Sequence, residues 1–182
     1  RLRLAEIHAS VEAGAQEIDV VITRGHVLLN RWEALYDEVA GFRHACGAAK
    51  LKVILGTGEL GTLTRAARAS MVSMMAGADF VKTSTGKEPV NATLPVGLAM
   101  ARTIRSYRNR TGFRVGLKPA GGIRTAKDAL QWMVLMKEEL GDEWLEADLF
   151  RFGASSLLAD IERQLEHHVT GRYSAFHRHA AG

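Results

Sequence analysis

Cysteine, long apolar runs and blocks of like charge are scarce in this sequence, and each scarcity excludes a class of protein. Cys46 is the only cysteine among 182 residues, so no internal disulfide can form and nothing points to secretion. No apolar run approaches the roughly 20 residues of a membrane span, and no signal peptide is visible at the N-terminus. No cluster of one charge indicates nucleic acid, although four excess positive charges suit an anionic substrate. We therefore expect a cytoplasmic protein without membrane or nucleic-acid partners.

The chain has the size and composition of a single folded domain spanning residues 1–182. Its apolar content of 47% and charged content of 24% are ordinary for a globular protein, and its length suffices for a core. Beyond Thr170 the sequence is polar and poorly patterned, which predicts a mobile tail over residues 170–182.

Helical and β-type patterns alternate along the whole chain. After a first helix over residues 2–13, five short β-rich runs each precede a segment with helical periodicity. The expected strands cover 17–22, 50–55, 80–84, 114–118 and 149–152. This alternation predicts an α/β fold with a parallel sheet, of the (β/α) TIM-barrel type. A helical solenoid could share the interval of 30 to 36 residues between units, but the β-rich runs argue against it.

The helical segments also carry specific expectations for packing and capping. Cys46 falls on an apolar face with Phe42, and the stripe that contains Met71, Met74 and Met75 is typical of core filling. Thr125 stands immediately before an apolar periodic segment, where its hydroxyl is expected to cap the helix.

Four consecutive expected strands carry an ionisable residue within an apolar run. These residues are Asp19, Lys52, Lys82 and Lys118. Singly, each is more often a strand-end charge or a structural ion-pair partner. Together they predict a catalytic cluster, because parallel strands bring their carboxyl ends to one mouth. Neighbouring lysines lower one another's pKa, which leaves one amine nucleophilic, and a carboxylate nearby can move protons. The residues alone do not say which lysine attacks.

Two glycine-rich loops indicate an anion site. Gly121 and Gly122 follow one expected strand, and Gly153, Ser155 and Ser156 follow the next. Glycines allow backbone N–H groups to approach an anion closely, and helix N-termini add positive potential. A glycine turn followed by a serine cap is the competing interpretation. We expect no metal site, because the adjacent His167 and His168 point to different helix faces.

Five ordered segments resemble the deoxyribose-phosphate aldolase family of class I aldolases. The two signature segments are Lys82-Thr-Ser-Thr-Gly-Lys87 and Gly116-Leu-Lys-Pro-Ala-Gly-Gly-Ile-Arg124. The likeness extends through Glu17-Ile-Asp-Val-Val21, Lys52-Val-Ile-Leu-Gly-Thr-Gly-Glu59 and Arg151-Phe-Gly-Ala-Ser-Ser156. It covers nearly the whole chain, and Thr170-Gly-Arg-Tyr173 is similar to the longer, eukaryote-like branch.

The resemblance implies an activity and a role for each candidate residue. The implied reaction is reversible cleavage of 2-deoxy-D-ribose 5-phosphate to D-glyceraldehyde 3-phosphate and acetaldehyde, in deoxyribonucleotide catabolism, without a cofactor. Lys82 would form the Schiff base, Lys118 would perturb its pKa and join a proton relay with Asp19 and a water, and Lys52 would be either a pocket residue or a structural ion pair. The implied phosphate-binding residues are Lys87, Gly121, Gly122, Arg124, Gly153, Ser155 and Ser156.

The sequence departs from the family at both ends. It opens in what looks like the helix before the family's fourth strand, so only the last five strands of eight are expected. Tyr173 is followed by nine more residues, so the role of the family's C-terminal tyrosine is not assigned to it. Two alternatives remain: another Schiff-base or transaldolase-like barrel, or a catalytically incompetent fragment that keeps a phosphate site or needs a partner. The expected partners are a small phosphorylated sugar, and either further copies of the chain or a missing N-terminal part.

Overall fold

A four-stranded parallel sheet organises the chain, and helices alternate with its strands. The computed structural model describes residues 2–175 and 178. The strands are β1 Glu17–Val21, β2 Lys50–Ile54, β3 Phe80–Lys82 and β4 Gly116–Lys118. The helices are α1 Leu2–Glu12, α2 Arg24–Leu28, α3 Trp32–Cys46, α4 Leu63–Met75, α5 Leu94–Thr111, α6 Ala126–Leu140 and α7 Leu157–Thr170. Two short 3₁₀ helices, η1 Thr57–Glu59 and η2 Asp142–Leu145, complete the described elements.

The strands lie in chain order β1-β2-β3-β4, and every pair is parallel. This order confirms the predicted α/β architecture, because each helix returns the chain to start the next strand beside the last. The register places Lys82 directly opposite Lys118 on the neighbouring strands β3 and β4. The register therefore places two lysines side by side at the carboxyl ends of β3 and β4.

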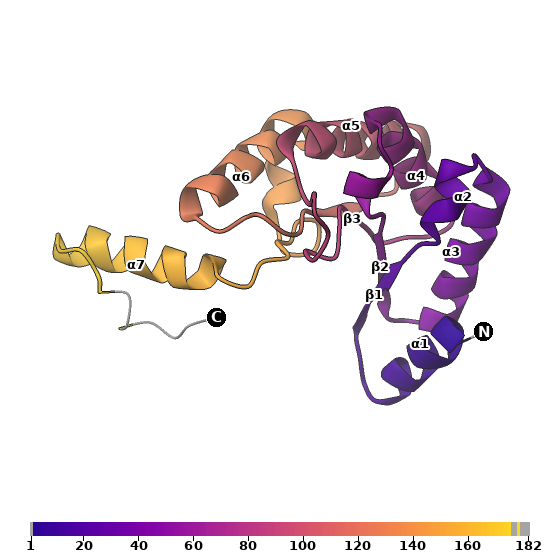
Figure 1. Ribbon diagram of the computed structural model, residues 1–182, viewed down its shortest axis with the longest axis horizontal. Coiled ribbons are helices and arrows are strands. Elements are labelled where there is room, and N and C mark those ends of the chain that lie inside the picture. The colour runs from indigo at the N-terminus through magenta and orange to yellow at the C-terminus, as the bar shows by residue number, and fades with distance from the viewer. Residues whose placement is uncertain (1, 176–177, 179–182) are drawn as a thin grey trace.

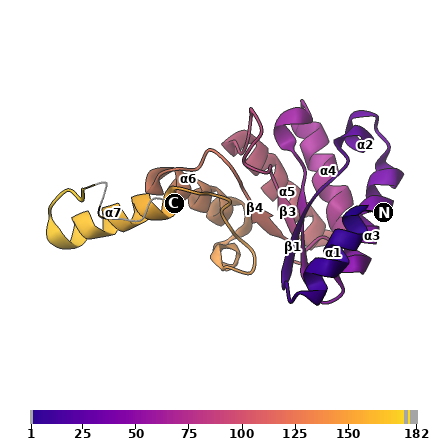
Figure 2. The ribbon, with the colours of Figure 1, turned by 60° about the horizontal axis from the view of Figure 1, so that its bottom comes forward.

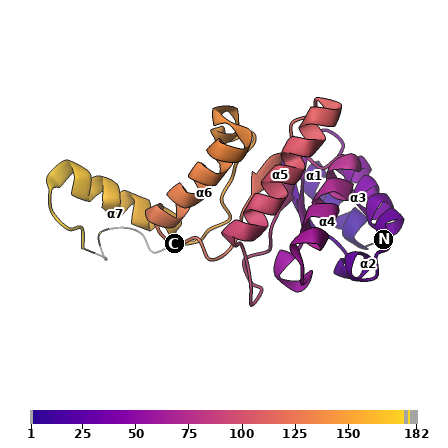
Figure 3. The same ribbon diagram turned by 90° about the horizontal axis from the view of Figure 1, so that it is seen from above.

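Helices cover one side of the sheet, and none of the described helices forms a layer on the other side. Figures 1 and 3 show α3, α4, α5 and α6 following one another in an arc along one side. Apolar side chains of the strands pack beneath this arc, and the fully buried ones include Leu51, Val53, Val81 and Leu117. Helix α7 extends away from the sheet at the C-terminal end of the arc (Figures 1 and 2).

The expected fifth strand, over residues 149–152, is not a strand. Two isolated parallel bridges, Leu117 with Phe150 and Ala120 with Gly153, are all that remain of its pairing with β4. The amide of Arg151 donates to the carbonyl of Leu117, and the amide of Gly153 donates to the carbonyl of Pro119. Between these bonds a continuous ladder would need an amide at position 119, and proline has none. Pro119 therefore divides the pairing into two short contacts.

Most of the local expectations about helices are confirmed. Cys46 and Phe42 are buried together in the core, and Thr125 caps α6 in a capping box with Asp128. The methionine stripe is only partly in the core, because Met74 is buried whereas Met75, the last residue of α4, is 58% exposed. None of the described helices is long and apolar enough to cross a membrane.

The expected mobile tail over residues 170–182 lies partly outside the described residues. Thr170 itself is the last residue of α7, and the chain leaves the helix through Gly171 with a left-handed φ of 68°. The side chain of Tyr173 is 93% exposed and its ring stacks on His167. The described part of this segment therefore stays on the surface beside α7.

Candidate active site

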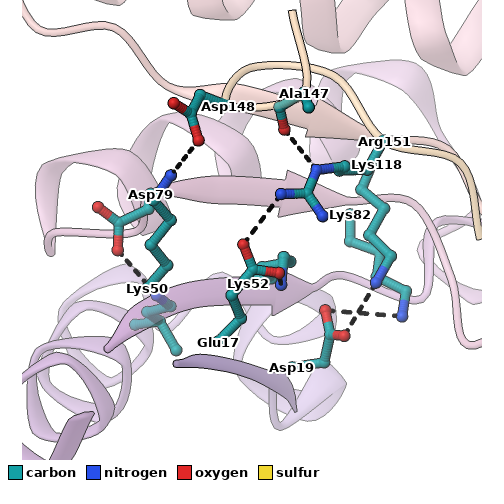
Figure 4. Close-up of polar contacts among 11 residues, drawn as sticks. Glu17, Asp19, Lys50, Lys52, Asp79, Lys82, Lys118, Ala147, Asp148 and Arg151 are labelled. Atoms are coloured by element: carbon teal, nitrogen blue, oxygen red, sulfur yellow. Dashed lines mark hydrogen bonds and ion pairs between the residues drawn. The ribbon is translucent and has the colours of Figure 1, made fainter. Parts of the chain in front are cut away.

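Three of the four predicted catalytic residues meet on the side of the sheet opposite the arc of helices α3 to α6. The carboxylate of Asp19 faces two amines (Figure 4). Its carboxylate accepts a hydrogen bond of 2.9 Å from Nζ of Lys118, and its other oxygen lies 3.7 Å from Nζ of Lys82. Asp19 comes from β1, whereas the lysines end β3 and β4. Curvature of the sheet thus brings an acid and two amines into one cluster.

Lys82 is the most nearly desolvated member of this cluster. The residue is 8% exposed, and burial is the main cause that lowers the pKa of its amine below the ordinary value. The negative charge of Asp19 opposes the shift, while the positive charges of Lys118 and Lys52 add to it. The predicted influence of neighbouring lysines is therefore present, but it is smaller than the effect of burial. A lowered pKa increases the fraction of neutral, nucleophilic amine.

Lys52 lies apart from this cluster in a separate ion pair. It is 3% exposed and donates a 2.5 Å hydrogen bond to Glu17 of β1. The other carboxylate oxygen of Glu17 accepts a 3.1 Å hydrogen bond from the guanidinium of Arg151. The hydrogen bond from Lys52 is the main cause that lowers the pKa of Glu17. Lys52 thus forms the structural ion pair that was one of its two expected roles. Its role in the pocket stays a prediction.

Glycine at position 116 makes the packing above Lys52 feasible. The ammonium of Lys52 lies 5.9 Å from the centroid of the Phe80 ring. A Cβ atom added at Gly116 would lie 2.3 Å from this ring. The absence of a side chain at Gly116 therefore lets the Phe80 ring pack against β4 beside the buried lysine.

All seven residues predicted to bind phosphate line one pocket of 290 Å³. Its remaining walls are Thr85, Gly86, Ile123 and Ala154. The pocket lies beyond the carboxyl ends of β3 and β4, because its loops directly follow these strands and the 149–153 segment. Only Thr83 and Ser84 separate Lys82 from the first residue of the pocket wall.

The charges around the pocket suit an anion, but they come from side chains more than from helix ends. Lys87 and Arg124 are exposed cations on its rim. Ser156 occupies the cap position of α7, yet its side chain makes no capping hydrogen bond. The start of α6 is already neutralised, because Asp128 accepts from the amide of Thr125 and Asp160 accepts from that of Ala126. Asp160 itself lies in the first turn of α7, so acidic side chains stand at the start of both helices, and the predicted contribution of the helix N-termini stays a prediction.

Several residues that shape the site were not predicted from the sequence. Glu17 and Arg151 are the ion-pair partners described above, Ser84 bonds the glycine loop at Ala120, and Asn91 packs against Gly121. Glu17 had a signal, because it precedes Asp19 by two positions and so faces the same side of β1. Among the described residues, no group of three or more histidine, cysteine or acidic side chains could hold a metal ion.

Comparison with known proteins agrees with this geometry. Residues 2–163 match the model of the DeoC/LacD family of aldolases. The chain is 67% identical over 177 residues to the deoxyribose-phosphate aldolase of Mus musculus and 65% identical over the same length to that of Homo sapiens; each match covers 97% of this chain and 56% of the relative. The structure of a deoxyribose phosphate aldolase from Aeropyrum pernix, described as a unique tetramer, superposes with a TM-score of 0.66 at 31% identity, covering 89% of this chain and 60% of that one.

These matches extend over nearly all of the present residues, although the chain spans only about half the length of the mammalian relatives. The family match covers the lysine cluster and the pocket alike. The chain therefore belongs to the DeoC/LacD family of aldolases.

Proposed function

We propose that this chain carries the catalytic cluster of a class I aldolase that reversibly cleaves 2-deoxy-D-ribose 5-phosphate to D-glyceraldehyde 3-phosphate and acetaldehyde. The observation that carries the proposal is the buried amine of Lys82 beside the hydrogen-bonded pair of Asp19 and Lys118. The anion pocket adjacent to this amine supports a phosphorylated substrate. The names of the mouse and human relatives support the choice of deoxyribose phosphate.

The reaction begins with covalent capture of the substrate. The neutral amine of Lys82 attacks the aldehyde carbon of the open-chain sugar, and the resulting carbinolamine loses water to give an iminium. The iminium then accepts the electron pair of the breaking bond between C2 and C3, which leaves an enamine on Lys82. The proton of the C3 hydroxyl leaves at the same time, and the aldehyde end of glyceraldehyde 3-phosphate is released.

The remaining steps need a proton donor and water. The enamine takes up a proton at C2, and hydrolysis of the new imine releases acetaldehyde and regenerates the amine of Lys82. Asp19 and Lys118 are the groups placed to move these protons, because a carboxylate oxygen of Asp19 lies 3.7 Å from the amine and the other oxygen is hydrogen-bonded to Lys118. No organic cofactor enters this scheme, since the iminium itself is the electron sink.

The proposal extends to the setting in which the enzyme works. The lone Cys46 is buried and unpaired, which supports a reducing, cytoplasmic location. The tetrameric relative from Aeropyrum pernix supports assembly with further copies of the chain.

A second candidate function is a catalytically incompetent unit that keeps the phosphate site or acts only with a partner. The observation that favours it is the open sheet: within the described residues, β1 pairs with β2 alone, and the 149–153 segment pairs with β4 alone. The chain also spans only about half the length of the relatives it matches. The two candidates differ in whether Lys82 forms an imine.

Trapping of the imine tests both candidates. The whole polypeptide that carries these residues is incubated with acetaldehyde and sodium borohydride, and the adduct is mapped by mass spectrometry. We expect labelling at Lys82 and loss of the label in Lys82→Arg, because a guanidinium stays protonated. Lys127→Arg, which changes an exposed lysine of α6, is the matched control and should leave labelling intact. Labelling at Lys118 or Lys52 in place of Lys82 would contradict the assignment.

A further inference from the structure

The two hydroxyl residues that follow Lys82 are buried and form hydrogen bonds within the protein. Thr83 and Ser84 are both fully buried. The hydroxyl of Ser84 donates a 2.6 Å hydrogen bond to the carbonyl of Ala120, and the amide of Ala120 donates a 3.0 Å hydrogen bond to the hydroxyl of Thr83. Both polar groups of the Ala120 peptide are therefore bound by the segment that leaves β3. Ala120 immediately precedes Gly121 and Gly122 in the anion pocket.

The side chain of Asn91 contacts Ser84 from within the same loop after β3. Its Oδ1 lies 3.0 Å from the hydroxyl of Ser84, and its Nδ2 donates a 2.7 Å hydrogen bond to the carbonyl of Glu88. The following residue, Ala92, donates its amide to the carbonyl of Ala120 at 3.2 Å. The side chain of Asn91 thus stabilises the loop after β3, while the backbone amide of Ala92 joins this loop to the one after β4.

The contact between these loops leaves no space for a side chain. Gly121 has a left-handed φ of 79°, and a Cβ atom added to it would lie 2.6 Å from Cγ of Asn91 and 2.7 Å from Cα of Gly86. Gly86 has a φ of 89°. Gly86 and Gly121 both line the anion pocket, so two of its walls touch each other and Asn91.

From these contacts we propose that Ser84 and Asn91 are positioning residues that hold the Gly121-Gly122 wall of the anion pocket at a fixed reach from the amine of Lys82. This proposal rests on the proposed function, because it assigns the two residues a role in choosing a phosphorylated over an unphosphorylated sugar. Neither side chain lines the pocket: Ser84 acts through the Ala120 peptide, and Asn91 acts through Ser84 and through its packing against Gly121.

The reason for such a device lies in the substrate. The aldehyde carbon at one end of the sugar must reach Lys82 while the phosphate at the other end sits in the pocket. Both ends are satisfied together only when the separation of amine and pocket matches the length of the sugar. A misplacement of about 1 Å can cost about 100-fold in rate when reacting groups must align. Hydrogen bonds from Thr83 and Ser84, the two residues directly after Lys82, can fix this separation over a short stretch of chain.

Two truncations and a matched control test the proposal in the whole polypeptide. Ser84→Ala removes the bond to Ala120, and Asn91→Ala removes the side chain that contacts the hydroxyl of Ser84 and packs against Gly121. Ser73→Ala is the control, because Ser73 is an equally buried serine of α4 whose hydroxyl has no hydrogen-bond partner. We expect Ser84→Ala and Asn91→Ala to raise KM for deoxyribose 5-phosphate about 10-fold, as for the loss of one buried hydrogen bond. KM for unphosphorylated deoxyribose and the rate of borohydride trapping with acetaldehyde should stay at the level of Ser73→Ala.

The possible outcomes separate positioning from general damage. An equal loss on both sugars would show a merely structural role and overturn the proposal, and so would the absence of any loss. Asn91 is only half-buried, so its variant carries the test if Ser84→Ala fails to fold. Titration with inorganic phosphate, monitored by calorimetry, measures phosphate binding independently of the aldolase reaction. If the parent protein traps no acetaldehyde, the proposed function fails. Weaker phosphate binding by Asn91→Ala than by Ser73→Ala would still support the positioning role. Equal phosphate binding by these two variants would overturn it.

Discussion

The carboxylate of Asp19 and the amine of Lys118 are 2.9 Å apart although two strands, β2 and β3, lie between the strands that carry them. Three strand spacings in a flat sheet would separate their backbones by about 14 Å. The contact therefore requires a strongly curved sheet, as in a barrel wall. Curvature, rather than pairing of neighbours, places the acid beside both lysines, and it makes the cluster sensitive to the shape of the whole sheet.

Removing the charge of Lys118 should shift the pH dependence of imine formation to higher pH. The positive charge of Lys118 is one of the causes that lower the pKa of Lys82, so Lys118→Met should raise that pKa. At neutral pH a smaller fraction of Lys82 is then neutral, and we expect trapping of acetaldehyde to slow several-fold. The measurement is the rate of borohydride trapping between pH 5 and 10.

Asp19→Asn supplies the test of opposite sign. The carboxylate of Asp19 raises the pKa of Lys82, so its removal should move the pH profile of trapping to lower pH. Turnover of deoxyribose 5-phosphate should nevertheless fall, because the proton relay is lost. Profiles that move in the same direction for the two variants would contradict the electrostatic account.

Negative charge in the glycine-serine loop should weaken recognition of the phosphate. Ser155 lines the pocket, and Ser155→Glu would place a like charge against the substrate. We expect KM for deoxyribose 5-phosphate to rise at least about 10-fold, the scale of one lost charge-assisted hydrogen bond, with little effect on unphosphorylated deoxyribose. Asn109→Glu, an exposed site near the end of α5, adds the same charge far along the chain from the pocket and should change neither constant. Equal effects of Ser155→Glu on the two sugars would count against phosphate binding here.

The ion pair of Glu17 and Lys52 should stabilise the fold in a pH-dependent way. Glu17→Gln leaves the side chain of Lys52, only 4% exposed, without its counter-charge. We expect a loss of about 3 kcal/mol in the free energy of unfolding, at the low end for a broken buried pair because Glu17 is partly exposed. Urea denaturation at pH 7 measures this loss.

The pH dependence follows from the lowered pKa of Glu17. A carboxyl whose pKa is lower in the folded state contributes stability above its ordinary value of 4.5, and this contribution disappears as the pH falls through the folded value. The difference between the parent and Glu17→Gln should therefore shrink below about pH 4.5. Asp148→Asn, which breaks the exposed pair with Lys50, is the control and should change stability little at any pH. A difference that grows on acidification would contradict this account.

The open edges of the sheet predict the behaviour of the 182-residue chain in isolation. The free side of β1 and the free side of the 149–153 segment present unpaired backbone groups, which promote association with other chains. We expect the isolated chain to self-associate or aggregate and to show little turnover. Its activity should rise when the part of the mouse relative that lies outside the match is supplied in trans. Light scattering and turnover of deoxyribose 5-phosphate measure both, and a stable monomer with full turnover would contradict this prediction.

The sequence predicted the parts of the site that depend on strand ends and loop composition. The positions of Lys82 and Lys118 follow from apolar runs that end in lysine, and the pocket follows from glycines and serines at strand-to-helix junctions. The contacts that depend on the curvature of the sheet could not be predicted from the sequence. The pairing of Glu17 with Arg151 joins residues 134 positions apart, and no local pattern specifies which charges meet across the sheet.

Two other differences were readable in principle. Pro119 has no amide N–H, which indicates that pairing beyond β4 is interrupted. The prediction of a strand instead followed the apolar run over residues 149–152. The hydroxyl residues after Lys82 lie in one of the two signature segments, yet their partner, the Ala120 peptide, is defined only when the two loops are packed together. The role of each candidate side chain in catalysis stays a prediction until the variants are made.

The close approach of Phe80 to Gly116 limits which variants of this protein can persist. Any side chain at position 116 must displace an aromatic ring that is fully buried, and the ring lies against the ammonium of Lys52. A change to alanine, the smallest available, already collides at 2.3 Å. In a library of random single substitutions, position 116 should therefore be depleted as severely as Lys82, although a glycine there carries no chemistry of its own.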